Sequence, residues 1–318
     1  MRRRNLGWLA MMGATMLALG CGGKAASTPT LVGNVPKPVV AAALDDLAYL
    51  PIDSDVVVSL DAATLRQSAM YRELVEPKLR AFVEASGSMG KFKSICGFDP
   101  FAAITSVAIG ARQLATADDP QSYSGVVVLH GFERQRLMSC LETFNREVGS
   151  DNRYLVDGDV IQVQTKGGQA GYMQFVDPST MVMVFDHQAT KAAFQTIIAG
   201  ASGVNGSPAF MALYGQTKGT ARFFINGRLK SMENSPLKVK VVFGAISVTD
   251  ALALNVSVRM NSDAEAKAIA DSVRPQLESL KSMVTSGTVD AVGADAHFTA
   301  SMTTEQLKNF MALVGMGG

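Results

Sequence analysis

The stretch ALALNVSVRMNSDAEAKAIADSVRPQLESLKSM (Ala251–Met283) contains, one after the other, the two hydrophobic periods that decide the fold. Its first part, Ala251–Met260, alternates apolar and polar side chains, which predicts a β-strand with one buried face. From Ser262 onward, apolar residues recur every three or four positions, which predicts an amphipathic helix. Ser262 and Glu265 form the capping box expected at the start of such a helix. The apolar stripe of this helix consists of Ile269, Val273, Leu277, Leu280 and Val284.

Short strands and amphipathic helices alternate through the whole 318-residue chain. Residues 44–206 and residues 207–318 each read as strand, helix, two strands, helix, strand and a closing helix, with extra strands in the first half. This order predicts an α+β fold in which antiparallel sheets carry helices on one face. It also predicts a tandem duplication of a β-α-β-β-α-β unit; the alternative is that any α+β chain can be aligned in this way. Two such units paired edge to edge would form one long sheet and cover two exposed edges.

Two local signals in the first half predict a helix cap and a turn. Asp61 ends a β-branched run and can cap the helix that follows it. The dipeptide Asp157–Gly158 joins two alternating runs, which predicts a hairpin with a type I′ turn.

The N-terminal residues have the pattern of an export signal. Arg2, Arg3 and Arg4 form a positive region, and Asn5–Gly20 form a mostly apolar segment, shorter than the ~20 residues that a membrane-spanning helix needs. The sequence LALGC (Leu17–Cys21) resembles the lipobox of bacterial lipoproteins, in which the signal is cut before the cysteine and the cysteine is acylated. The resemblance implies a signal peptide over residues 1–20 and a lipid anchor on Cys21. The alternative is an ordinary cleaved signal with a chance cysteine.

Residues 21–43 contain small residues and prolines and are almost uncharged, which predicts a flexible tether behind the lipidated cysteine. Gly22, and not an aspartate, follows Cys21. By resemblance to the enterobacterial sorting rule, this favours the outer membrane. We therefore expect a cell-envelope protein, held at the membrane through Cys21 as an outer-membrane lipoprotein that faces the periplasm or the cell surface.

The segment LPIDSDVVVSLDAATLRQS (Leu50–Ser68), together with CGFDP (Cys96–Pro100), resembles a group of uncharacterised bacterial envelope proteins. The shared pattern is Leu-Pro-x-Asp, a strand ending in Leu-Asp, and a helix with Leu-Arg-x-Ser. No activity is established for that group, so the resemblance implies no reaction or ligand.

If Cys21 is acylated, Cys96 and Cys140 remain as a pair in an oxidising compartment, where a disulfide between them is expected. Cys140 shares a helical stripe with Leu137, Leu141 and Phe144, so it should face the core. The alternative is two buried free thiols, since cysteine packs well as a small apolar residue.

The sequence contains no recognisable catalytic or metal-binding motif. It lacks G-x-S-x-G, a P-loop, G-x-G-x-x-G, H-E-x-x-H and C-x-x-C. Its three histidines, His130, His187 and His297, stand alone in their segments, and we expect each to be a surface or structural residue. The 29 basic and 28 acidic residues form no long basic run outside the leader, which argues against nucleic acid as a partner. No catalytic residue, metal or cofactor is therefore predicted.

The remaining candidate site is an apolar surface formed by Met173, Phe175, Met181 and Met183 on consecutive predicted strands. Methionine is frequent where apolar ligands bind loosely, although a plain core beneath helices is the alternative. The first functional hypothesis is a non-enzymatic, lipid-anchored envelope protein that acts through protein contacts or as a structural module. The second is a carrier that binds an apolar ligand or lipid on a curved sheet, and the third is a hydrolase of unknown type.

Overall fold

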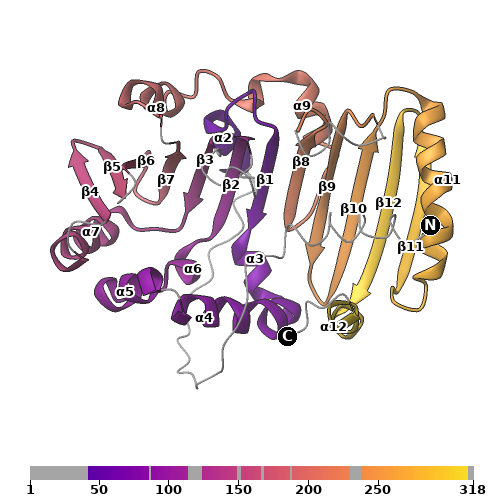
Figure 1. The fold of residues 1–318 in the computed structure, drawn as a ribbon, viewed down its shortest axis with the longest axis horizontal. Coiled ribbons are helices and arrows are strands. Elements are labelled where there is room, and N and C mark those ends of the chain that lie inside the picture. The colour runs from indigo at the N-terminus through magenta and orange to yellow at the C-terminus, as the bar shows by residue number, and fades with distance from the viewer. Residues whose placement is uncertain are drawn as a thin grey trace.

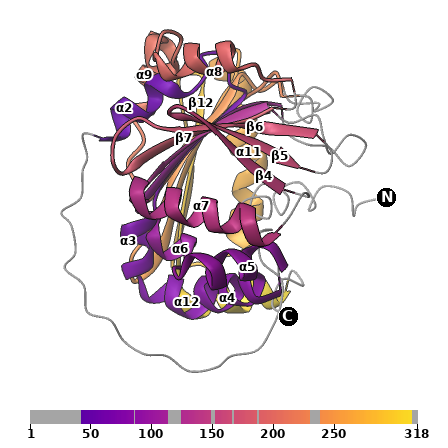
Figure 2. The ribbon, with the colours of Figure 1, turned by 90° about the vertical axis from the view of Figure 1, so that its left-hand side faces the viewer.

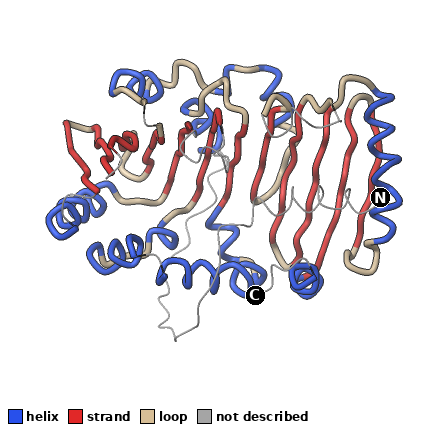
Figure 3. Tube along the Cα trace, in the orientation of Figure 1, coloured by secondary structure: helices blue, strands red, loops and turns tan. Residues whose placement is uncertain are grey.

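The computed structural model describes residues 42–85, 87–113, 124–148, 152–165, 168–186, 188–229 and 238–313. These residues form one twelve-stranded sheet in the order β11-β12-β10-β9-β8-β1-β2-β3-β7-β6-β5-β4 (Figure 1). Every strand pair in it is antiparallel, and Figure 3 shows the strands side by side. The predicted α+β class with antiparallel strands is therefore confirmed.

The strands are β1 (Val56–Asp61), β2 (Ser106–Gln113), β3 (Ser124–His130), β4 (Asn152–Asp157), β5 (Val160–Thr165), β6 (Gly168–Phe175), β7 (Thr180–Phe185), β8 (Ala221–Asn226), β9 (Val241–Val248), β10 (Ala251–Arg259), β11 (Ser286–Val292) and β12 (Asp295–Thr303). The α-helices are α2 (Ala42–Tyr49), α3 (Ala62–Gln67), α4 (Glu76–Ala85), α5 (Gly87–Cys96), α6 (Pro100–Ala103), α7 (Arg134–Val148), α8 (Lys191–Ile198), α9 (Pro208–Tyr214), α11 (Asp263–Ser279) and α12 (Thr304–Leu313). A π-helical turn, Tyr71–Val75, precedes α4, and a 3-10 turn, Val204–Gly206, precedes α9.

The two halves of the chain meet where β1 pairs with β8 in the middle of the sheet. The register runs from Val56 opposite Ile225 to Leu60 opposite Ala221. This pairing confirms the expectation of one long sheet built edge to edge. Outward from this junction, the order is β1-β2-β3-β7-β6 on one side and β8-β9-β10-β12-β11 on the other. The strands that the sequence aligned, such as β2 with β9 and β3 with β10, thus lie at equal distances from the junction. The duplication itself and the boundary between residues 206 and 207 stay predictions.

Helices cover both faces of the sheet in the first half, although the sequence pattern indicated one face. Helices α2, α8 and α9 pack on one face, here called the α9 face, and α5, α6 and α7 pack on the other, the α11 face (Figure 2). The reason lies in strands such as β7, where Val182 is buried with Phe194 on the α9 face. The next residue, Met181, is buried with Leu137 on the α11 face. A strand that is apolar on both sides must be covered on both sides.

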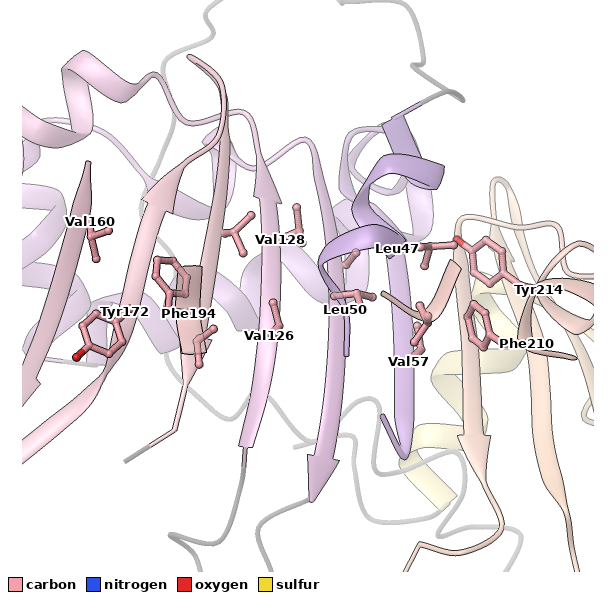
Figure 4. Packing of buried hydrophobic residues seen from close by; sticks show 14 residues of the cluster. Leu47, Leu50, Val57, Val126, Val128, Val160, Tyr172, Phe194, Phe210 and Tyr214 are labelled. Carbon is pink, nitrogen blue, oxygen red and sulfur yellow. The ribbon is translucent and has the colours of Figure 1, made fainter. Parts of the chain in front are cut away.

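The main core cluster lies on the α9 face of the first half. Figure 4 shows Leu47 and Leu50 next to the strands, with Phe210 and Tyr214 beside them near β1. Phe194 of α8 is fully buried, and its ring stacks on Tyr172 at a centroid distance of 5.7 Å. This cluster ties helices from both halves of the chain to one sheet.

In the second half, α11 packs on the α11 face through Ile269 and Val273 of its predicted apolar stripe. Leu280 and Val284 of that stripe lie beyond the end of the helix, and Leu280 is exposed. Ala266 and Ile269 pack on Met260 and Ala296, with Val273 beside them. The predicted cap is confirmed, because the Ser262 hydroxyl accepts a hydrogen bond from the Glu265 amide at 3.3 Å. In the described part of the chain, no helix is both long enough and apolar enough to cross a bilayer.

Candidate functional site

The α9 face of the second half carries an open row of polar side chains, in contrast to the covered face of the first half. Because side chains alternate along a strand, every second residue of β10, β12 and β11 points to this side. Most of these residues are exposed or half-buried. We call this surface the polar face; it consists of Asn255, Ser257, Ser286, Thr288, His297, Thr299 and Ser301.

Hydroxyl groups on the polar face are linked across neighbouring strands. The Oγ atoms of Ser286 and Ser301 lie 2.7 Å apart. The Oγ1 atoms of Thr288 and Thr299 are also 2.7 Å apart. These pairs follow from the register, in which each residue stands directly opposite its partner. The result is a surface of paired hydroxyl groups that can donate and accept further hydrogen bonds.

A cavity of about 120 Å³ lies at the inner margin of the polar face. The segment that follows α9 forms one wall, because Thr217 turns the chain there and donates its hydroxyl hydrogen to the Tyr214 carbonyl at 2.8 Å. Strands β9, β10 and β12 form the other wall. The polar groups that line the cavity belong to Gln216, Thr217, Lys218, Asn255, Ser257 and His297.

His297 is held by a hydroxyl group on the neighbouring strand. Its Nδ1 lies 2.8 Å from Ser257 Oγ, and Ser257 is 5% exposed. Asp290 stands opposite His297 on β11, so aspartate, histidine and serine occupy one row across three strands. Among the described residues, no hydrogen bond joins Asp290 to His297. The row therefore lacks the carboxylate–imidazole contact of a Ser-His-Asp triad.

The other described histidine, His130, is fully engaged inside the fold. Its Nε2 lies 2.6 Å from Asp46 Oδ1, and its Nδ1 lies 2.9 Å from Thr180 Oγ1. The hydrogen bond with Asp46 is the main cause that raises the pKa of His130 above its ordinary value, against the opposing effect of burial. Asp46 and Thr180 are both buried. His130 is thus the structural histidine that the sequence indicated, and it fastens α2 to the sheet.

The two internal cysteines lie within disulfide distance, as expected. Their Cα atoms are 4.9 Å apart, with Cys96 at the end of α5 and Cys140 in α7. Cys140 is 6% exposed, which confirms that it faces the core. A bond between them links two helices on the α11 face of the first half.

The predicted apolar ligand surface is core in this structure. Met173, Phe175 and Met181 are each at most 5% exposed, and Met183 packs against them. They lie beneath α7, whose Leu137 belongs to the same cluster. Burial of these side chains is what the core alternative predicts.

Several predicted positions lie outside the described residues, among them the signal peptide, Cys21, most of the tether and His187. Within the described residues, no group of three or more His, Cys, Asp or Glu side chains could hold a metal ion. The pairing of Ser257 with His297 was not foreseen, since it depends on strand register. No protein-family model, no curated protein and no solved structure matches this chain.

Proposed function

We propose that this chain is a lipid-anchored cell-envelope protein without enzymatic activity, which binds a partner through the polar face. The anchor is Cys21, and the membrane is the outer membrane. In this proposal residues 21–43 lead from the lipid to α2, and the second half presents the polar face on the side opposite α11.

The single observation that carries the proposal is the difference between the two halves. Over the strands of the first half, α2, α8 and α9 cover the α9 face with a buried apolar cluster; α9 itself belongs to the second half and also packs on β9 through Leu213 and Phe243. In the second half, the same side of β10, β12 and β11 is polar and open, with Asn255, Thr288 and Thr299 exposed. A hydroxyl-rich surface of this kind has hydrogen-bonding groups to offer a partner, whereas the covered face has none.

Site-specific photocrosslinking in the native membrane tests the partner role. A photoreactive residue at Thr299 should give a discrete adduct. The matched control position is Ala268, an exposed residue of α11 on the opposite side of the sheet. Thr288→Lys, which places a charge beside Thr299, should abolish the adduct. Equal adducts at Thr299 and Ala268, or none at Thr299, would contradict the proposal.

Metabolic labelling with a radioactive fatty acid tests the anchor. Label should enter the wild-type protein and be lost in Cys21→Ser, while Cys96→Ser should keep it. Equal labelling after Cys21→Ser would rule out the lipid anchor. Native mass spectrometry of the purified protein distinguishes the carrier alternative from the partner-binding proposal, because a carrier retains a co-purifying lipid.

A further inference from the structure

We propose that the cavity beside His297 receives a carboxylate group of a ligand, in the position that Asp46 takes beside His130. The inference deepens the function proposed for the polar face and rests on it. It names the chemistry of the group that this face recognises.

The first step of the argument is that each half contains a histidine and a hydroxyl residue paired across corresponding strands, with the two residue types exchanged between those strands. His130 of β3 stands opposite Thr180 of β7, and His297 of β12 stands opposite Ser257 of β10. Strands β3 and β10 are both third from the central junction, and β7 and β12 are both fourth. In both pairs the hydroxyl oxygen lies within 2.9 Å of the histidine Nδ1. The remaining imidazole nitrogen, Nε2, is left for another partner.

The second step concerns what approaches that nitrogen. Helix α2 precedes β1 and brings Asp46 to within 2.6 Å of His130 Nε2. Helix α9 precedes β8 in the same way, but its sequence PAFMALY and the following Gln216–Lys218 contain no carboxylate. Among the described residues, none makes a hydrogen bond to His297 Nε2. The cavity of about 120 Å³ lies against His297, where the first half places an aspartate.

The third step is the charge around the cavity. Lys218 lines it and has no ion pair with any described residue. Arg222 lies on the same face of β8, with its guanidinium 4.2 Å from the ring centre of Tyr214. None of the residues that line the cavity is acidic. Asp295 is paired with Arg259 by two hydrogen bonds, and Asp290, opposite His297 on β11, is exposed and lies outside the cavity lining. The cavity therefore favours an anion.

The polar face indicates how the rest of the ligand is held. Asn255 lines the cavity and is itself exposed, and Thr299 stands opposite it on β12. A ligand whose carboxylate lies beside His297 can therefore continue over the hydroxyl groups outside. Both a small organic acid and the free C-terminal end of a peptide have this chemistry.

The test follows histidine ring resonances by NMR in the full-length, detergent-solubilised protein. The probes are acetate, a tripeptide with a free C-terminal carboxylate, the same tripeptide as its C-terminal amide, and inorganic phosphate. His297→Gln assigns the resonance. We expect saturable shifts of the His297 resonance with the free-acid tripeptide, with acetate, or with both, and none with the amide. Tighter binding of the tripeptide than of acetate identifies a chain end as the source, and equal binding identifies a small acid.

Matched variants make the result specific. Lys218→Gln should weaken binding about two- to fivefold, the range for an exposed ion pair. Lys281→Gln, an exposed lysine beyond α11, should leave binding unchanged. The His130 resonance should ignore acetate in the wild type and respond to it in Asp46→Ala, where the internal carboxylate is missing.

Three outcomes would overturn the inference: no shift of the His297 resonance, equal shifts with the amide, or tighter binding of phosphate than of any carboxylate. The crosslinking experiment detects a partner in the membrane, and the NMR experiment detects a ligand bound to the purified protein. Failure of one is therefore distinguishable from failure of the other.

Discussion

Replacing Asp46 by asparagine tests how the first helix of the fold is held. The side chain is 7% exposed, and its Oδ1 lies 2.6 Å from His130 Nε2. Asparagine keeps the size of the side chain and a carbonyl oxygen that can still accept from the imidazole. The substitution therefore removes the negative charge with little change in packing, and the neighbouring Leu47 and Leu50 stay in the core.

The loss of unfolding free energy in Asp46→Asn should depend on pH, because His130 gains or loses a proton as the pH changes. Its pKa is raised in the folded protein, chiefly by Asp46. A raised folded pKa means that the stabilisation is fully present below the ordinary value of about 6.5 and is lost as the pH rises through the folded pKa. In acid, Asp46→Asn removes a charge-assisted hydrogen bond and should cost about 1.5–3 kcal/mol of unfolding free energy. In alkali, where the imidazole is neutral, the cost should fall to about 0.5–1.5 kcal/mol.

Urea unfolding at about pH 5.5 and about pH 9 measures this difference, since both lie well away from the ordinary histidine pKa. The matched control is Asp53→Asn, whose partner Arg112 is exposed and whose ion pair should contribute less than about 1 kcal/mol at both pH values. In a His130→Gln background, the cost of Asp46→Asn should no longer depend on pH. An equal cost at the two pH values in the wild-type background would refute the reasoning.

Three further predictions concern stability, each measured by urea unfolding. Replacing both Cys96 and Cys140 by serine should lower the unfolding free energy by about 2–4 kcal/mol, because their separation of 44 residues closes a long loop; reductant should destabilise the wild type alone. Phe194→Ala should cost about 3–5 kcal/mol, since the ring is fully buried. Gly131→Ala should cost more than Gly158→Ala, for which strain alone predicts about 1–2 kcal/mol. Both glycines have positive φ, but a Cβ at residue 131 would lie 2.1 Å from a carbonyl oxygen, whereas at residue 158 nothing lies within 4 Å.

Local features of the fold could be predicted because they depend on neighbours in the chain. Ser262 caps α11, and Asp61 caps α3 by accepting from the Thr64 amide at 2.8 Å. The hairpin at Asp157 is also present, although its turn differs in type. Gly158 has a φ of 64°, and no residue other than glycine has a positive φ in the described structure. That combination fits a type II′ turn, since type I′ needs two positive values.

The contacts that matter for the candidate site could not be predicted, because they join residues far apart in the chain. Asp46 and His130 are 84 residues apart, and Ser257 and His297 are 40 apart. Each pair depends on which strands are neighbours and on their register, and a shift by one residue would move His297 to the other face. The sequence correctly indicated that each histidine was isolated within its own segment. It did not indicate that Asp46 and Thr180 would bind His130, or that Ser257 would bind His297.

The two histidines share one type of hydrogen bond to a hydroxyl group, which belongs to the core in the first half and to the proposed ligand site in the second. Beside His130 the carboxylate belongs to the protein, so its binding energy is part of the folding free energy and the site is closed. Among the described residues, no carboxylate makes a hydrogen bond to His297 and none lines its cavity, so the same interactions are available to a molecule that arrives from outside. Helix α2, which supplies Asp46, directly follows the predicted tether and contacts β2 and β3, whereas the open site lies over β9, β10 and β12. The proposed anchor and the proposed carboxylate site belong to opposite halves, and a substitution at one histidine should leave the role of the other intact.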